Sequence, residues 1–279
     1  MRSLATALIL MLAAIPHSSS AAGRVFFEDF ESYNVGTLPA TQWQQDLPHN
    51  LLQVVTSSVD GRAGPHSGTK MGMGNWDGNA NDFTTAKLSS WSYTREFLIR
   101  LWVRYDADVD HVTGNKAFRL DNFQSPPAES YYFDGQVESQ PTAPMFSFWE
   151  VVAGKTITGS PYENFNGGPL GDTKWHKIEI YVKHNTVGQK DGILRVWNDG
   201  NLVHDITGIQ SVTDGNKWYP MYLMSNWSNF AHDANNHAYW DDIEIFSDTG
   251  TGGTGNMFDA TICDGPTCKP PKPLNLRVQ

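Results

Sequence analysis

Apolar and polar side chains alternate along several short stretches of the chain, and this spacing predicts β-strands. Between 175 and 203 the apolar residues recur at every second position: Ile178, Ile180, Val182, Leu194 and Val196. Successive side chains of a strand point to opposite faces, so these five predict a buried face shared by two antiparallel strands. The dipeptide Asp199-Gly200 follows the second strand and is among the strongest short-range turn signals.

The opposite face of this hairpin carries rings and charges: Glu179, Tyr181, Lys183, Arg195 and Trp197. The stretch from 95 to 105 divides in the same way, with Phe97, Ile99, Leu101, Val103 and Tyr105 on one face and Leu98, Arg100, Trp102 and Arg104 on the other. A solvated sheet face normally carries small polar and charged residues, so rings beside cations indicate a surface for a ligand. We therefore predict one continuous ligand surface, formed by Arg100, Trp102, Arg104, Tyr181, Lys183, Arg195 and Trp197.

Further strands are predicted at 25–30, 71–73, 116–120, 144–152, 218–227 and 238–246, and no stretch has the pattern of a helix or of a repeat. An aromatic content of 12%, with 25 glycines and 15 prolines, favours short strands joined by many turns. The spacing of these strands suits an all-β fold, a two-sheet antiparallel sandwich that runs from about 25 to 247.

Both ends of the chain differ from this domain. Residues 1–22 combine Arg2, an apolar run and small residues before Gly23, which predicts a secretory signal peptide and a secreted domain at 23–247. No later stretch approaches the roughly 20 apolar residues of a membrane helix, so we expect no membrane segment after the signal peptide. We expect the exported protein to be a monomer. The tail at 248–279 is rich in Gly, Thr and Pro, and Cys263 and Cys268 predict a local disulfide there rather than a metal site.

Several motifs give the chain a resemblance to a known family. FFEDFESYNVGTLP, HSGTKMGM, WHKIEIYVKHNT with DGILRVWNDGNLV, and YWDDIEIF follow in an order that resembles secreted concanavalin A-like β-jelly-roll proteins, over about 25–246. Within this group the chain is similar to jelly-roll polysaccharide lyases. The resemblance implies a jelly-roll fold and cleavage of a uronic-acid-containing polysaccharide by β-elimination on the concave sheet.

Such an elimination needs a group that stabilises the uronate carboxylate and a base that removes the C5 proton. Arg100, Arg104, Arg195 and Lys183 are candidates for the first role, and Tyr181 is the candidate for the second, with His184, His176 and His111 as alternatives. The remaining face residues, Trp102, Glu179 and Trp197, would bind substrate. The structural alternatives are a packing ring at Tyr181, ion pairs between the arginines and Glu179, and a strand-end histidine at His184.

Acidic residues near both ends of the domain predict a cation site. The jelly rolls that the chain resembles bridge their first and last strands with calcium, which implies a structural calcium ion held by Glu31 and Asp241 and main-chain oxygens. The alternative is a pair of water-exposed carboxylates. The long polar loop at 226–237 predicts sugar contacts at Asn226 and Trp227, whereas its His232, Asp233 and His237 match no strong metal motif.

These features limit the function to a few classes. A net charge of −10 opposes nucleic-acid binding, and the chain has no phosphate loop or serine nucleophile elbow. It also lacks the E-x-D-x-x-E type of strand motif by which glycosidases of this fold place two carboxylates. A lyase acting on an acidic polysaccharide, a noncatalytic carbohydrate-binding or surface-recognition module and a structural jelly roll without a ligand are the hypotheses that remain.

Overall fold

The computed structural model describes residues 23–36, 43–45, 52–75, 86–88, 95–105, 115–120, 131–140, 143–152, 173–209, 221–223 and 237–247. Strands are the only regular elements within these ranges. No helix in them is long and apolar enough to cross a membrane. The predicted signal peptide at 1–22 and the tail at 248–279, with Cys263 and Cys268, lie outside the described residues and stay predictions.

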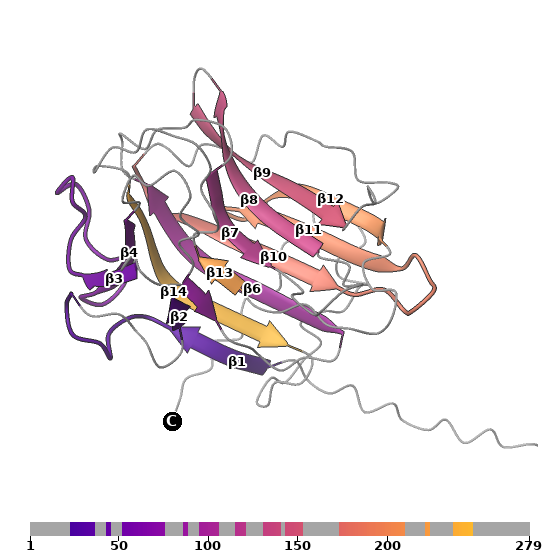
Figure 1. The fold of residues 1–279 in the computed structure, drawn as a ribbon, viewed down its shortest axis with the longest axis horizontal. Helices are drawn as coiled ribbons and strands as arrows, with labels where there is room; N and C mark the ends of the chain where they lie inside the picture. The colour runs from indigo at the N-terminus through magenta and orange to yellow at the C-terminus, as the bar shows by residue number, and fades with distance from the viewer. Residues whose placement is uncertain are drawn as a thin grey trace, which may run out of the picture.

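Eight strands form the larger antiparallel sheet (Figure 1). In spatial order it contains β12 (Asn201–Ile209), β11 (Gly192–Asn198), β10 (His176–Lys183), β6 (Glu96–Tyr105), β14 (His237–Ser247), β4 (Met71–Asn75) and β3 (Leu52–Val55). β1 (Gly23–Glu28) pairs with the second half of β14, whose first half pairs with β4. The first and last strands therefore lie side by side, as the resemblance implies.

Six strands form the other sheet, which Figure 1 shows as a second layer. In spatial order they are β2 (Trp43–Gln45), β5 (Ala86–Leu88), β13 (Met221–Leu223), β7 (Asn115–Leu120), β8 (Tyr131–Gln140) and β9 (Ala143–Val152). All their pairings are antiparallel. The predicted all-β, two-sheet antiparallel sandwich is thus confirmed.

One contact between the sheets identifies their inner faces. The ring of Phe26 in β1 meets that of Trp43 in β2 edge-on at 6.0 Å, and the indole of Trp43 donates a hydrogen bond to Glu28 at 3.3 Å. Phe26 pairs with Ile245, which in turn pairs with Ile99. Because paired residues share a face of a sheet, the apolar set of β6 faces the six-stranded sheet.

The hairpin between β10 and β11 follows the predicted register. Ile180 pairs with Val196 and Val182 with Leu194, and all five predicted core residues of these strands are at most 3% exposed. After β11, Asp199 and Gly200 have φ values of 49° and 77°. Two successive positive φ values are those of a type I′ turn, so the predicted turn is confirmed and leads into β12.

Candidate functional site

The predicted ligand surface lies on one face of the eight-stranded sheet, as the alternation indicates. Strand pairing aligns Leu98, Tyr181 and Arg195 in one row and Arg100, Glu179 and Trp197 in the next. The apolar residues of these strands face the six-stranded sheet, so these two rows of rings and charges face away from that sheet. We call the face that carries them the outer face of the eight-stranded sheet.

The cations of the outer face are paired with carboxylates of the same chain. Arg100 donates to Glu179 at 2.9 Å and to Glu244 at 3.0 Å, and Lys177 lies 3.1 Å from the second oxygen of Glu179. Arg195 donates to Asp205 at 2.7 Å. The arginines are buried, at 6% and 4% exposure. A uronate carboxylate would have to replace these existing partners, so the arrangement supports the alternative of structural ion pairs.

Arg104 is the most enclosed of these arginines, with no exposed surface. It donates to the carboxylate of Asp60 and to the carbonyl of Thr173, both at 2.8 Å. Burial acts to raise the pKa of Asp60, but hydrogen bonds from Ser58, the amide of Arg62 and Arg104 lower it to about 2. Asp60 is therefore a carboxylate partner, and Arg104 cannot contact a polymer unless the loop that carries Asp60 moves away.

Tyr181 and Lys183 share one carboxylate. The Tyr181 hydroxyl donates to Glu96 at 3.1 Å, and Lys183 Nζ lies 3.8 Å from the other oxygen of Glu96. Burial and then the negative charge of Glu96 raise the pKa of Tyr181 far above its ordinary value. A tyrosine base must be able to form phenolate, so this environment does not favour Tyr181 as the proton acceptor.

The remaining predicted residues contact other parts of the chain or lie outside the described residues. His184 follows the last residue of β10, and its amide donates to the carbonyl of Arg95 at 3.0 Å. His176 begins β10 and lies beside the turn between β11 and β12, 2.7 Å from a carboxylate oxygen of Asp199. Trp102 stacks on His66 with ring centres 3.7 Å apart. His111, Asn226, Trp227, His232 and Asp233 lie outside the described residues, and His237 is buried in β14.

A polar row that the sequence did not reveal crosses the six-stranded sheet. Residue pairing runs through one position of every strand: Gln44, Lys87, Tyr222, Arg119, Asp134 and Trp149. A parallel row on the same face contains Lys116, Gln136 and Ser147. We call these nine positions the polar row.

The polar row lies on the face of its sheet that is turned away from the eight-stranded sheet. Trp43 and Leu88, which pair with each other, are one position out of step with the row and hence on the opposite face. Both are buried, and Trp43 meets β1 of the other sheet. The same apolar face continues through Leu223, Phe118 and Phe148 at alternate positions of β13, β7 and β9.

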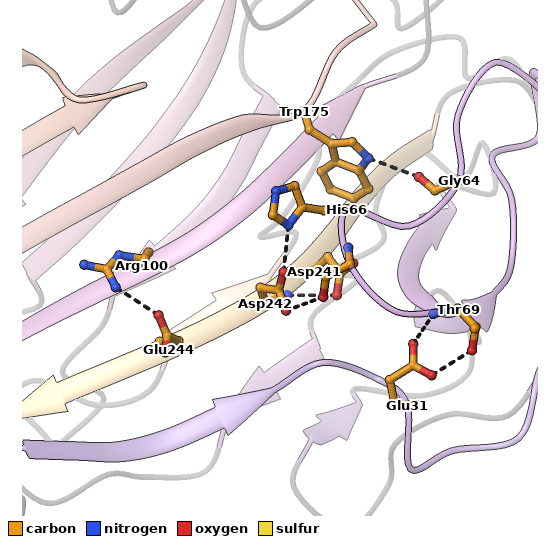
Figure 2. Close-up of polar contacts among 10 residues, drawn as sticks. Glu31, Gly64, His66, Thr69, Arg100, Trp175, Asp241, Asp242 and Glu244 are labelled. Atoms are coloured by element: carbon orange, nitrogen blue, oxygen red, sulfur yellow. Dashed lines mark hydrogen bonds and ion pairs between the residues drawn. The ribbon is translucent and has the colours of Figure 1, made fainter. Parts of the chain in front are cut away.

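The two predicted calcium ligands meet the same turn of the chain, residues 66–70, from opposite sides (Figure 2). The Glu31 carboxylate accepts hydrogen bonds from the amide and hydroxyl of Thr69, at 2.6 and 2.7 Å. Asp241 accepts from the amide of Ser67 at 3.1 Å. Among the residues that the structure describes, no three His, Cys, Asp or Glu side chains gather where they could hold a metal ion.

The buried carboxyl of Asp241 should make the stability of the fold depend on pH. Its side chain has no exposed surface, and burial raises its pKa to about 7 although backbone amides oppose the shift. Because this value lies above that of an unfolded aspartate, about 3.9, the stabilisation is complete below about pH 4 and is lost as the pH rises through 7. We expect the melting temperature of Asp241→Asn to fall less between pH 4 and 8 than that of the parent. Equal slopes in the two thermal melts would contradict this assignment.

Comparisons with known proteins rest on structure alone, since no protein-family model and no curated sequence matches the chain. The endo-β-1,4-glucuronan lyase of the fungus Trichoderma reesei superposes with a TM-score of 0.51 at 13% identity, over 80% of this chain and 95% of that one.

Two further solved structures are similar over most of the chain. A mutant of alginate lyase Aly36B in complex with alginate trisaccharide has a TM-score of 0.48 at 14% identity, and covers 82% of this chain and 98% of its own. The cellulose-induced protein Cip1 has a TM-score of 0.48 at 17% identity, over 81% and 100%. The fold that the chain shares with the glucuronan lyase is an all-β jelly-roll sandwich.

Proposed function

We propose that this protein is an exported polysaccharide lyase that cleaves a uronic-acid-containing polymer by β-elimination on the polar row of the six-stranded sheet. The observation that carries the proposal is the continuity of the row, which has a polar or aromatic residue on every strand of the sheet. Strands lie about 4.8 Å apart, so five spacings give a track of about 24 Å, long enough for several sugar units.

The residue types in the row suit the reaction. Lys87, Lys116 and Arg119 are cations that can neutralise a uronate carboxylate and the charge that develops on it during proton removal. Tyr222 is flanked in the pairing by Lys87 and Arg119. Tyrosine is a residue type that can remove the C5 proton, and Tyr222 is the tyrosine of the polar row, so we assign it the role of the base.

The glucuronan lyase that shares this fold acts, as its name states, on a polymer of glucuronic acid. We extend that substrate class, uronic-acid polymers, to this chain because three cations stand in the polar row despite the net charge of −10. At an ionic strength near 0.15 M charges are screened over about 8 Å, so the cations of the polar row, rather than the net charge of the chain, determine the interaction with a bound polymer.

Incubating the protein with glucuronan, alginate, pectate and glycosaminoglycans tests the proposal. We expect the ultraviolet absorbance of unsaturated uronate to rise with at least one of these polymers. The second candidate, a noncatalytic carbohydrate-binding module on the same face, is favoured by Trp149, whose residue type stacks on sugar rings. Retention of the protein on a polymer without any new absorbance would support that candidate and contradict the lyase.

A further inference from the structure

The loop that follows β1 and the turn that precedes β4 hold each other through five hydrogen bonds. Three of them end on the Glu31 carboxylate, donated by the amide and hydroxyl of Thr69 and by the amide of Lys70. The other two come from Lys70 Nζ, which donates at 2.7 Å to the carbonyl of Glu31 and at 2.7 Å to the carbonyl of Tyr33. Two carbonyls of the loop therefore bind a cation that belongs to the chain.

This arrangement does not fit the calcium ion that the resemblance implies. Calcium needs six to eight oxygens, and main-chain carbonyls and carboxylates are its ordinary ligands. Here the Glu31 carboxylate already accepts three hydrogen bonds and its carbonyl accepts the ammonium of Lys70. The second predicted ligand, Asp241, accepts the amides of Ser67 and Asp242 instead. An ammonium group at these oxygens also repels a divalent cation.

The turn from 66 to 70 does what a bridging ion would do. Its first half is bound to the last strand through Asp241 and through Asp242, which accepts from the Ser67 hydroxyl at 2.8 Å and lies 2.7 Å from Nδ1 of His66. Its second half is bound to the loop after β1 through Glu31. Carboxylates from both ends of the domain are thus joined through amides, hydroxyls and the His66 ring of one turn, and the Lys70 ammonium adds bonds to the carbonyls of Glu31 and Tyr33.

Gly68 allows this close approach. Its φ of +62° lies in the left-handed region, and a Cβ placed there would lie 2.5 Å from a carboxylate oxygen of Glu31. Only glycine combines that backbone conformation with room for the carboxylate. The turn HSGTK therefore contains the glycine that leaves room for the Glu31 carboxylate and the lysine whose ammonium binds the Glu31 carbonyl.

We propose that the Lys70 ammonium is the built-in cation of this jelly roll: it occupies the position between the loop after β1 and the turn before β4, and the folded protein needs no calcium there. The proposal does not depend on the proposed enzymatic function, because its readout is the stability of the fold.

Thermal melts of the full chain test it in two ways. In the parent, a chelator such as EDTA and an excess of calcium chloride should give the same melting temperature within about 1 °C, since a ligand that binds only the folded state would raise it. Lys70→Met, which keeps the stem and removes the ammonium, should lower the melting temperature by about 4–10 °C, because two carbonyls lose a charged donor. The control Lys190→Met removes an exposed lysine and should leave the melt unchanged.

Several results would overturn the proposal. They are a melting temperature that falls in chelator, one calcium ion per chain in elemental analysis, or a Lys70→Met protein as stable as the parent. If Lys70→Met does not fold, the chelator melt of the parent still decides, and Lys70→Arg, which keeps a cation at this position, should melt above any variant that lacks one.

Discussion

Tyr222→Phe is expected to reduce the rate of unsaturated uronate formation by about 100-fold or more, because general base catalysis typically contributes a factor of 10² to 10⁴. The change removes only a hydroxyl group, so binding of the polymer and the melting temperature should stay close to those of the parent. The measurement is the initial rate of the absorbance increase on whichever polymer the parent cleaves, together with retention on that polymer.

The matched control is Tyr181→Phe. Tyr181 lies on the outer face of the eight-stranded sheet, where its hydroxyl donates to Glu96 and burial raises its pKa. We expect this variant to keep its activity within about threefold, since no step of the elimination uses that hydroxyl. A loss of activity in Tyr181→Phe with a normal rate in Tyr222→Phe would show that the base is Tyr181, on the outer face.

Arg104→Met is expected to lower the free energy of unfolding by about 3–5 kcal/mol, the usual effect of breaking a buried ion pair from one side. The guanidinium has no exposed surface, and its removal takes the charged donor away from Oδ2 of Asp60 and from the carbonyl of Thr173. Chemical denaturation measures the loss directly. Asp60→Asn removes the charge that Arg104→Met leaves unpaired, so the double variant should regain part of the lost free energy of unfolding.

The control for this variant is Arg62→Met, a substitution of an exposed arginine in the same loop, which should change the free energy of unfolding by less than about 0.5 kcal/mol. An Arg104→Met protein as stable as this control would show that the Arg104–Asp60 pair does not stabilise the fold. It would also reopen the possibility that Arg104 is available to a ligand.

Alternation of apolar residues was sufficient to predict the hairpin of β10 and β11, β6 and the core positions, because the face that each of these strands turns to the six-stranded sheet is apolar. It could not tell a ligand face from a face of internal ion pairs. The partners that cover the arginines come from remote segments: Glu244 is 144 positions from Arg100, and Asp60 is 44 positions from Arg104.

The polar row was missed for a related reason. Each of its main positions comes from a different strand, so only the pairing of strands brings them together. β8 was not predicted at all, since its centre is Asp134-Gly135, a dipeptide that normally indicates a turn. The convergence of Glu31 and Asp241 was predicted through calcium, but the structure joins them through the turn at 66–70 and the ammonium of Lys70.

A pair of matched arginine variants shows whether the ligand face belongs to the six-stranded sheet or to the outer face of the eight-stranded sheet. Arg119 lies in the polar row, whereas Arg195 pairs with Asp205 on the outer face of the other sheet. The measurement is the rate of unsaturated uronate formation on the polymer that the parent cleaves. Arg119→Ala should lose about 100-fold or more and keep its melting temperature, and Arg195→Ala should lose stability and keep its rate while folded. The opposite pattern, a normal rate in Arg119→Ala and a lost rate in a folded Arg195→Ala, would place the ligand face on the eight-stranded sheet instead.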